Sequence, residues 1–224
     1  MKTRVMAAAL WGMCTVAQAG VIDFNPADPV CNNASNGNGG IVACGDYAYI
    51  AQSYGDVAGV LDVQYSAPRL ENTTLRWWDA NYNNLHGVAW ADSSDPNSKA
   101  RIDLVPLNGQ GVMLTHFDLG AYSNTSRSTT LTITAIGGPV LFAPPTGNVG
   151  GLPGNMASSF DGNWYGANGI RIEWQDSAYN VGIDNITYQM AGAVPEPATF
   201  LMMAAGLICM GGIARRVKPE PFKK

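Results

Sequence analysis

The sequence predicts an all-β fold, organised as a single β-sandwich between two processed chain ends. Apolar and polar residues alternate with a period of two in many short segments. Clusters rich in Gly, Pro and Asn separate these segments, and no stretch between the two ends keeps helical periodicity for three turns. The 224 residues are 46% apolar and 13% charged, a composition that favours a folded chain over a disordered one.

Residues 1–19 have the three parts of a secretory signal peptide. Lys2 and Arg4 make the start basic, residues 5–16 are uncharged and apolar, and Ala17-Gln18-Ala19 is a small-x-small cleavage site. The alternative, a buried first helix, does not account for this order. We therefore expect export through the inner membrane and a mature chain that starts at Gly20.

The other end predicts a short transmembrane helix. Residues 198–214 carry no charge, and as a helix they would span about 25 Å, the short end of what crosses a bilayer. Arg215, Arg216 and Lys218 follow at once. Basic residues beside an apolar helix stay cytoplasmic, so the rest of the chain is expected outside, with the helix as a transient anchor.

The residues on both sides of this helix have the pattern of a sorting signal. Pro195, Glu196 and Pro197 stand immediately before it, and Arg215 and Arg216 immediately after it. Prolines keep the segment extended and accessible to a processing enzyme. Residues 193–224 resemble the PEP-CTERM sorting signal, which implies an exosortase as partner and a Gram-negative bacterium that makes extracellular polysaccharide. An ordinary C-terminal membrane anchor is the alternative, and it leaves Glu196 unexplained.

Residues 20–192 are expected to form the sandwich, most simply a jelly roll. Four segments alternate clearly and predict strands with one buried face: 61–65, 101–104, 130–135 and 170–175. Five clusters predict turns: 92–97, 108–109, 137–139, 146–154 and 166–169. Segments 21–24 and 181–188 are expected as the first and last strands, lying close together.

The last strand contains a break in its alternation. Ile183 and Ile186 are three residues apart, which predicts a β-bulge at Asp184-Asn185. The ending Gly-Ile-Asp-Asn-Ile, like the phrase at 117–122, resembles PEP-CTERM ectodomains and galactose-binding-like jelly rolls. That resemblance implies a structural Ca²⁺ held by Asp184, with Asp23 as a second ligand. The alternative is a carboxylate that accepts backbone N–H groups, and no other cofactor is expected.

The net charge and the number of cysteines narrow the class of protein further. Residues 20–194 carry 15 acidic and six basic side chains, a net charge of −9, which argues against nucleic-acid binding. Two cysteines remain in this region, Cys31 and Cys44. An even pair in an exported domain predicts a disulfide, which would close an Asn/Gly-rich loop.

Catalytic motifs are absent from the sequence. His86 and His116 fit no metal or protease spacing, and no nucleophile elbow or phosphate loop is present. Glycoside hydrolysis needs two flanking carboxylates, but Glu173 is expected to pair with Arg171 on its own strand. No catalytic residue is assigned.

Aromatic residues give the better functional signal. Trp77 and Trp78 are adjacent, so on a strand they point to opposite faces. Trp164 and Tyr165 are expected in a Gly/Asn-rich loop spanning 161–169. Trp78, Trp164 and Tyr165 are therefore candidates for sugar binding, because sugars stack an apolar face on flat rings. The alternative is that these rings belong to the core.

Together these features predict a non-catalytic protein of the cell surface or extracellular matrix, associated with exopolysaccharide or biofilm. A carbohydrate-binding module that recognises exopolysaccharide is the alternative. A polysaccharide-active enzyme is a weaker one.

Overall fold

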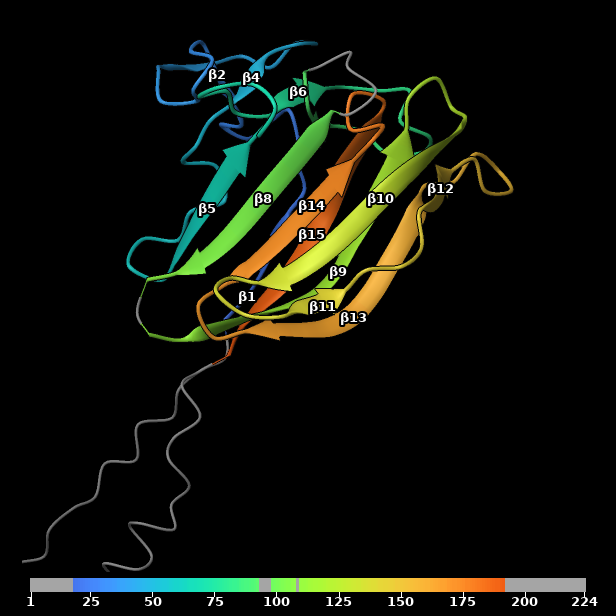
Figure 1. The fold of residues 1–224 in the computed structure, drawn as a ribbon. Coiled ribbons are helices and arrows are strands. Elements are labelled where there is room, and N and C mark those ends of the chain that lie inside the picture. The colour runs from blue at the N-terminus through green and yellow to red at the C-terminus, as the bar shows by residue number, and fades with distance from the viewer. Residues whose placement is uncertain (1–17, 93–97, 108, 192–224) are drawn as a thin grey trace, which may run out of the picture. The chain divides into compact units, whose positions relative to one another are not determined.

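The computed structural model describes residues 18–92, 98–107 and 109–191, and within these ranges the chain forms strands and no helix (Figure 1). The predicted all-β sandwich is confirmed. No helix in these ranges is long and apolar enough to cross a membrane. Residues 1–17 of the predicted signal peptide, the sorting signal and the helix predicted at 198–214 lie outside the described residues.

The strands of the described ranges form two sheets. The first sheet has the order β13-β9-β15-β7-β6-β4-β2-β3, and β1 also pairs with β15. Its strands are β1 (Ala19–Ile22), β2 (Cys31–Asn32), β3 (Ile41–Val42), β4 (Tyr49–Ile50), β6 (Arg76–Trp78), β7 (Val88–Trp90), β9 (Gly111–Ala121), β13 (Ser158–Gly166) and β15 (Val181–Ala191).

The second sheet has the order β11-β10-β14-β8-β5, and β12 also pairs with β10. Its strands are β5 (Leu61–Ser66), β8 (Lys99–Pro106), β10 (Ser126–Ala135), β11 (Val140–Phe142), β12 (Gly147–Gly150) and β14 (Ile170–Gln175). The long strands β8, β9, β10, β13, β14 and β15 alternate between the two sheets, as they do in a jelly roll.

Cross-strand rows in the second sheet explain why the alternating segments fold as they do. Four partners meet across β10, β14, β8 and β5, and all face the main core: Ile133, Ile172, Ile102 and Tyr65. Each is at most 1% exposed. The polar residues between them point outward, so the period of two in the sequence becomes the two faces of the sheet.

The outward-facing side chains of the second sheet correct the expectation that Glu173 pairs with Arg171. Arg171 pairs with Asp103 across the strands, through hydrogen bonds of 2.8 and 2.7 Å, and not with Glu173. Glu173 pairs instead with Lys99 and Arg101 at 2.5 and 2.9 Å. Side chains two apart on a strand are farther from each other than partners on the neighbouring strand, so the cross-strand pairs form.

The first and last strands lie side by side, as predicted. Ile22 pairs with Ile186, and Ala19 pairs with Gln189, so β1 begins beside the end of β15 (Figure 1). β1 ends at Ile22, and Asp23 follows it rather than lying within it. Both chain ends of the described sandwich therefore leave it at the same end.

Two segments expected as turns or loops are partly strands. Within 146–154, β12 pairs with β10. Within 161–169, Trp164 and Tyr165 belong to β13, which pairs with β9. Glycine is needed at position 162 for a reason other than a loop. The register of β13 shifts between Asp161 and Trp164, and a Cβ on Gly162 would lie 2.5 Å from the Trp164 ring. The glycine thus belongs to a bulge in a strand.

The predicted bulge in the last strand is present. The register of β15 against β9 shifts between Asp184 and Thr187, and Asn185 has a φ of 55°. Ile183 and Ile186 are both fully buried in the main core. The extra residue keeps both isoleucines inside and places Asp184 and Asn185 toward the neighbouring loops.

The predicted disulfide between Cys31 and Cys44 is also present, with a Cα–Cα distance of 5.1 Å. Inside the loop that it closes, the Asn32 side chain accepts from the N–H groups of Ala34 and Gly39 and donates to the Gly39 carbonyl, each at 2.9 Å. The loop therefore has a fixed conformation despite its Asn/Gly-rich composition.

Candidate functional site

A cluster of aromatic rings covers the outer face of the first sheet where β6 and β7 pair. Trp77 turns inward and donates its indole N–H to the Phe24 carbonyl at 2.8 Å. Trp78 turns outward, with its ring centre 6.1 Å from that of Trp90 on β7. The prediction that Trp77 and Trp78 face opposite ways is confirmed.

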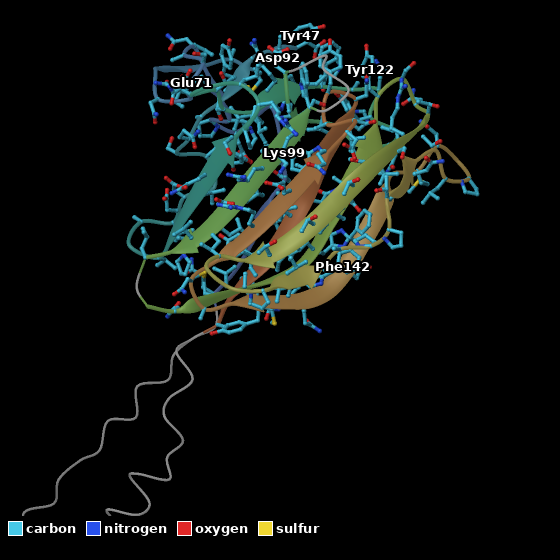
Figure 2. All side chains as sticks on the ribbon, viewed as in Figure 1. Tyr47, Glu71, Asp92, Lys99, Tyr122 and Phe142 are labelled. Carbon is cyan, nitrogen blue, oxygen red and sulfur yellow. A yellow bond between two sulfur atoms is a disulfide. The ribbon has the colours of Figure 1, made fainter. Side chains whose placement is uncertain are left out.

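Tyrosines from separate loops complete this cluster, which we call the aromatic pocket. Its cavity measures about 40 Å³ and is lined by Tyr47, Trp78, Tyr82, Trp90, Tyr122 and Tyr179. The ring of Trp78 lies 4.8 Å from Tyr47 and 5.3 Å from Tyr122, centre to centre, in edge-to-face contact. Figure 2 shows Tyr47 and Tyr122 at the same end of the sandwich.

An unpaired donor lies in the wall of the aromatic pocket. Trp90 is 1% exposed, and its indole N–H has no hydrogen-bond partner among the described residues. The indoles of Trp77 and Trp174, by contrast, each donate to a backbone carbonyl. A buried N–H without a partner costs roughly 1–3 kcal/mol, so this atom is a natural contact for a ligand or a bound water.

Two tyrosine hydroxyls at the same place are already in hydrogen bonds: Tyr82 donates to the Tyr179 carbonyl at 3.2 Å, and Tyr179 bonds with Tyr47. Burial and then a hydrogen bond with Tyr47 raise the pKa of Tyr179, and burial raises the pKa of Tyr82 well above its usual range. Both hydroxyls therefore keep their protons at neutral pH. The pocket offers flat rings with O–H and N–H groups and carries no charge of its own.

The exposed rim of the pocket is held in place by an arginine. Arg76 stacks over the ring of Tyr49 at 3.7 Å and forms a 2.6 Å ion pair with Asp92. It also donates to the backbone carbonyl of Tyr47, which has a φ of 68° and a side chain that is 48% exposed. Tyr47 is thus a fixed, solvent-facing ring rather than a loose loop residue.

The opposite rim is fixed by a buried asparagine. Asn83 accepts from the N–H of Ala121 at 2.6 Å and donates to Thr125 and Asn155 at 3.1 and 3.0 Å. Asn83 is 7% exposed, and its bond to Ala121 is buried, while the bonds to Thr125 and Asn155 are partly buried. They tie the loop that carries Tyr82 to the turn after β9.

The structure does not bring together the three residues predicted to bind sugar. Trp78 belongs to the aromatic pocket. Trp164 is 9% exposed and packs against Phe117 and Phe142 in the main core, and Figure 2 shows Phe142 far from Tyr47 and Tyr122. Tyr165 follows it on β13, 46% exposed. Between β13 and β6 lie β9, β15 and β7.

Sequence reasoning missed the tyrosines of the pocket, since they come from loops far apart along the chain. Tyr47, Tyr122 and Tyr179 share no spacing or motif that would have grouped them. The only usable signal was the adjacent pair Trp77-Trp78, which indicated one outward ring.

Asp23 and Asp184, the predicted calcium ligands, line one cavity of about 310 Å³. Asp184 is 4% exposed and accepts the N–H of Asn185 at 2.8 Å. Burial, with Asp23 and Asp118 nearby, raises the pKa of Asp184 to about 8. Asp23 accepts the Tyr54 hydroxyl at 3.2 Å.

These groups fit calcium only in part. Carboxylate oxygens suit Ca²⁺, which takes six to eight oxygen ligands. The amide oxygens of Asn25 and Asn84, also on this cavity, already accept backbone N–H groups. No group of three or more His, Cys, Asp or Glu side chains in the described ranges is placed to hold a metal ion. The calcium site therefore stays a prediction.

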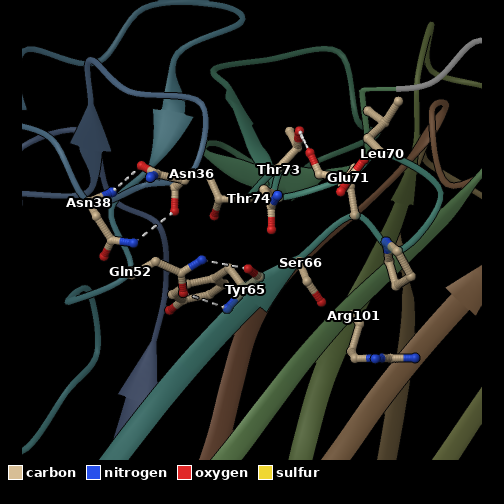
Figure 3. A pocket seen from close by; sticks show the side chains of 13 residues that line it. Asn36, Asn38, Gln52, Tyr65, Ser66, Leu70, Glu71, Thr73, Thr74 and Arg101 are labelled. Carbon is tan, nitrogen blue, oxygen red and sulfur yellow. Dashed lines mark hydrogen bonds between the residues drawn. The ribbon is translucent and has the colours of Figure 1, made fainter.

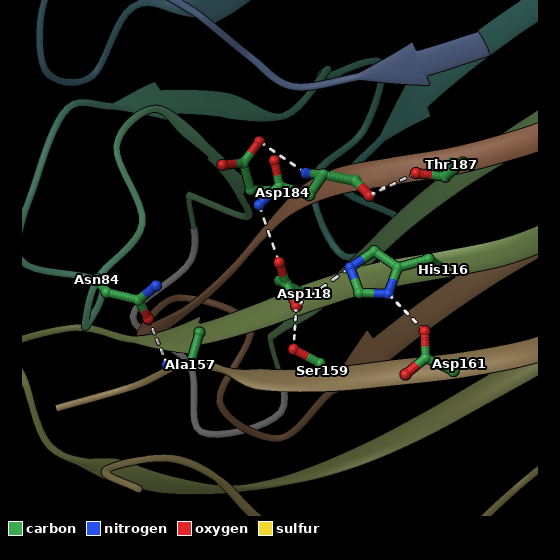
Figure 4. Close-up of polar contacts among 9 residues, drawn as sticks. Asn84, His116, Asp118, Ala157, Ser159, Asp161, Asp184 and Thr187 are labelled. Carbon is green, nitrogen blue, oxygen red and sulfur yellow. Dashed lines mark hydrogen bonds and ion pairs between the residues drawn. The ribbon is translucent and has the colours of Figure 1, made fainter. Parts of the chain in front are cut away.

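A polar network continues from this cavity across β15, β9 and β13 (Figure 4). Asn185 and Ser159 both donate to Asp118, at 2.8 and 2.5 Å. His116 pairs with Asp161 at 2.8 Å and lies 3.5 Å from Asp118. Because the Ser159 hydroxyl is directed to a carboxylate and not to the imidazole, this arrangement does not activate a nucleophile.

Comparison with known proteins identifies the C-terminal region. Residues 193–216 match the PEP-CTERM protein-sorting motif. The motif marks an exported protein of the cell envelope that an exosortase processes. It covers the predicted Pro-Glu-Pro segment, the apolar stretch and Arg215-Arg216, all beyond the described residues.

No curated protein matches this chain. Among solved structures it is similar to a mutant of CBM29-2, from a study of ligand recognition by family 29 carbohydrate-binding modules. The TM-score is 0.33 at 13% identity, over 79% of this chain and 93% of the other. A TM-score this low indicates neither a shared ligand nor a shared site.

Proposed function

We propose that the protein is a non-catalytic component of the cell surface or extracellular matrix, sorted there by an exosortase and associated with exopolysaccharide. The sorting motif at 193–216 carries this proposal. The polar network around His116 supports the non-catalytic part, since the Ser159 hydroxyl donates to Asp118 and not to the imidazole.

The positions of the chain ends support display at a surface. β15 ends at Ala191, where the tail begins, and β1 starts beside it. The aromatic pocket lies at the other end of β15, because Tyr122 bonds to Asn180 just before that strand. Eleven residues of strand span roughly 35 Å. A domain attached through its tail would present the pocket away from the attachment point.

Mass spectrometry of the protein from its native producer tests this proposal through its two mature termini. We expect a chain that starts at Gly20 and ends near Pro195. A chain that keeps residues 200–224 would indicate a plain membrane anchor, and the matrix role would lose its support. Retention of residues 1–19 would contradict the signal peptide.

Carbohydrate binding is the second candidate function, and the aromatic pocket favours it. Sugars present an apolar face that stacks on aromatic rings and hydroxyls that pair with donors at the ring edges. Tyr47 and Trp78 supply rings, and the Trp90 N–H, which has no partner among the described residues, supplies a donor. A cavity of about 40 Å³ is too small to enclose a sugar, so a polysaccharide would lie across the rim at Tyr47.

Affinity of the purified mature protein for the producer's own exopolysaccharide tests the second candidate. We expect Tyr47→Ala and Trp78→Ala each to weaken binding roughly three- to tenfold, the worth of one aromatic contact. Tyr165→Ala is the matched control, since Tyr165 is 46% exposed against 48% for Tyr47 and lies on β13, outside the pocket. Weakening in the control alone would place the site at β13 instead. Turnover of the polysaccharide would favour the weaker alternative of an enzyme.

A further inference from the structure

A larger cleft lies apart from the aromatic pocket, where the disulfide-closed loop meets the edge strand β5. It measures about 510 Å³, within the range of small-molecule sites. Its polar lining comes from four segments of the chain and includes Asn36, Asn38, Gln52, Glu71, Thr74 and Arg101 (Figure 3). It shares no residue with the aromatic pocket. We call it the amide cleft.

The floor of the amide cleft is rigid. The Gln52 side chain donates to the Tyr65 carbonyl at 2.7 Å and accepts the Tyr65 N–H at 3.0 Å, as Figure 3 shows. The Gln52 N–H in turn donates to the Gly37 carbonyl at 3.0 Å. Gly37 has a φ of 76°, and a Cβ there would lie 2.6 Å from the Ile50 carbonyl oxygen. Gln52 therefore joins the loop to β5: its backbone bonds to the loop, and its side chain bonds to the strand.

The wall of the cleft holds a buried hydroxyl without a partner. Thr74 is fully buried, and its Oγ1 forms no hydrogen bond with any described residue. Its backbone N–H donates to the Ser35 carbonyl at 2.9 Å, which holds the backbone at this position. A polar atom in this state is unfavourable in the free protein and gains most from a ligand that supplies a partner.

The chemistry of the lining selects a ligand class. Arg101 is already engaged by Glu173 at 2.9 Å, and Glu71 is exposed, so the cleft does not present an unpaired positive charge to an anion. The ring of Tyr65 is 1% exposed and is not available for stacking. The rest of the lining is uncharged: amides and hydroxyls, together with the apolar side chains of Ala67, Pro68 and Leu70. Such a mixture suits a neutral ligand that carries both hydroxyl groups and an apolar face.

We propose that the amide cleft binds a neutral saccharide unit through hydrogen bonds, as a second glycan site with Thr74 at its wall. The choice of ligand class rests on the carbohydrate-binding function proposed above, but the site itself does not use the aromatic pocket. The ectodomain would then contact a polysaccharide in two ways: by stacking at Tyr47 and Trp78, and by hydrogen bonding in the cleft.

Thr74→Val is the test variant, because it replaces only the hydroxyl with a methyl group of similar size. Removing an unpaired buried hydroxyl should leave the melting temperature unchanged or raise it. The probes are D-glucose, D-galactose and D-mannose, titrated separately into the mature protein, with glycerol as the control for a non-specific polyol effect. Binding is read by calorimetry and by the rise in melting temperature.

At least one sugar is expected to bind Tyr165→Ala as tightly as the unaltered protein, and to bind Thr74→Val roughly two- to tenfold more weakly. Absence of binding by all three sugars, or equal binding by Thr74→Val, would overturn the amide cleft as a site. Binding lost in Trp78→Ala but kept in Thr74→Val would leave the aromatic pocket as the glycan site and refute the cleft. Weaker binding by Thr74→Val together with unchanged binding by Trp78→Ala would support the cleft and count against the aromatic pocket as a glycan site.

Discussion

The side-chain amide of Asn185 donates to Oδ2 of Asp118 at 2.8 Å, and this contact follows from the bulge in the last strand. The left-handed backbone of Asn185 turns its side chain along the outer face of the first sheet. The same turn leaves the preceding residue, Asp184, buried beside two other carboxyl groups, Asp23 and Asp118. One inserted residue thus connects the strand register to a buried titratable group.

Asp184 predicts an unusual pH dependence of stability. Burial raises its pKa in the folded chain to about 8, whereas an unfolded aspartate titrates near 4. Between these values the folded state binds more protons than the unfolded state. Its free energy of unfolding therefore falls as pH rises, by at most about 1.4 kcal/mol per pH unit from this group. Chemical denaturation between pH 5 and pH 9 measures the slope.

Asp184→Asn separates the two interpretations of this residue. The amide mimics the protonated carboxyl, so this variant should lose the negative slope and be more stable than the unaltered protein at pH 8. If Asp184 instead binds calcium, added Ca²⁺ should raise the melting temperature of the unaltered protein and not that of the variant. A melting temperature indifferent to both calcium and chelator would refute the metal site.

The disulfide predicts a second measurable effect. Cys31 and Cys44 are 13 residues apart, and closing a loop of that length is worth roughly 3 kcal/mol. The double variant Cys31→Ser with Cys44→Ser should lower the free energy of unfolding by about this amount. Because Asn36 and Asn38 of the closed loop line the amide cleft, the variant should also weaken sugar binding there. Unchanged stability would mean that the Asn32 hydrogen bonds hold the loop unaided.

The parts of the fold that the sequence predicted are those with a local physical signal. Strands with one buried face, such as β8 and β14, show the period of two directly. The bulge at Asp184 appears as two isoleucines spaced by three. β7 gives no such signal, because Val88, Ala89 and Trp90 are all buried, with cores on both of its faces.

The parts that the sequence did not predict depend on pairing and register. Glu173 takes its partners from β8, which only the strand order can reveal. Trp164 was placed in a loop because glycines flank it, whereas the glycines serve a bulge and a turn. The aromatic pocket needs four loops brought to one end of the sandwich, and no spacing along the chain encodes that meeting.

Trp164 is predicted to stabilise the core and not to bind sugar. Its ring centre lies 5.2 Å from that of Phe142 and 6.0 Å from that of Phe117. Trp164→Ala should cost about 3–5 kcal/mol of unfolding free energy, as truncation of a buried aromatic ring usually does. Tyr165→Ala, at the exposed neighbour, should cost far less. Equal losses in urea denaturation would show that β13 is not packed as described.

Asn83 supports the last prediction, which concerns how the aromatic pocket is held. Its Nδ2 group donates to two acceptors, the Thr125 carbonyl and the Asn155 side chain, in a buried site. In Asn83→Asp an oxygen would face both acceptors, at a cost of about 2–4 kcal/mol near neutral pH. Burial should raise the pKa of the introduced carboxyl. Its protonation restores one donor, so the loss of stability should shrink as pH falls.

Asn81→Asp is the control, because Asn81 has a similar left-handed φ but is exposed. This variant should change stability by less than about 0.5 kcal/mol. A pH-independent loss in Asn83→Asp would instead show that the site excludes the carboxyl by shape alone.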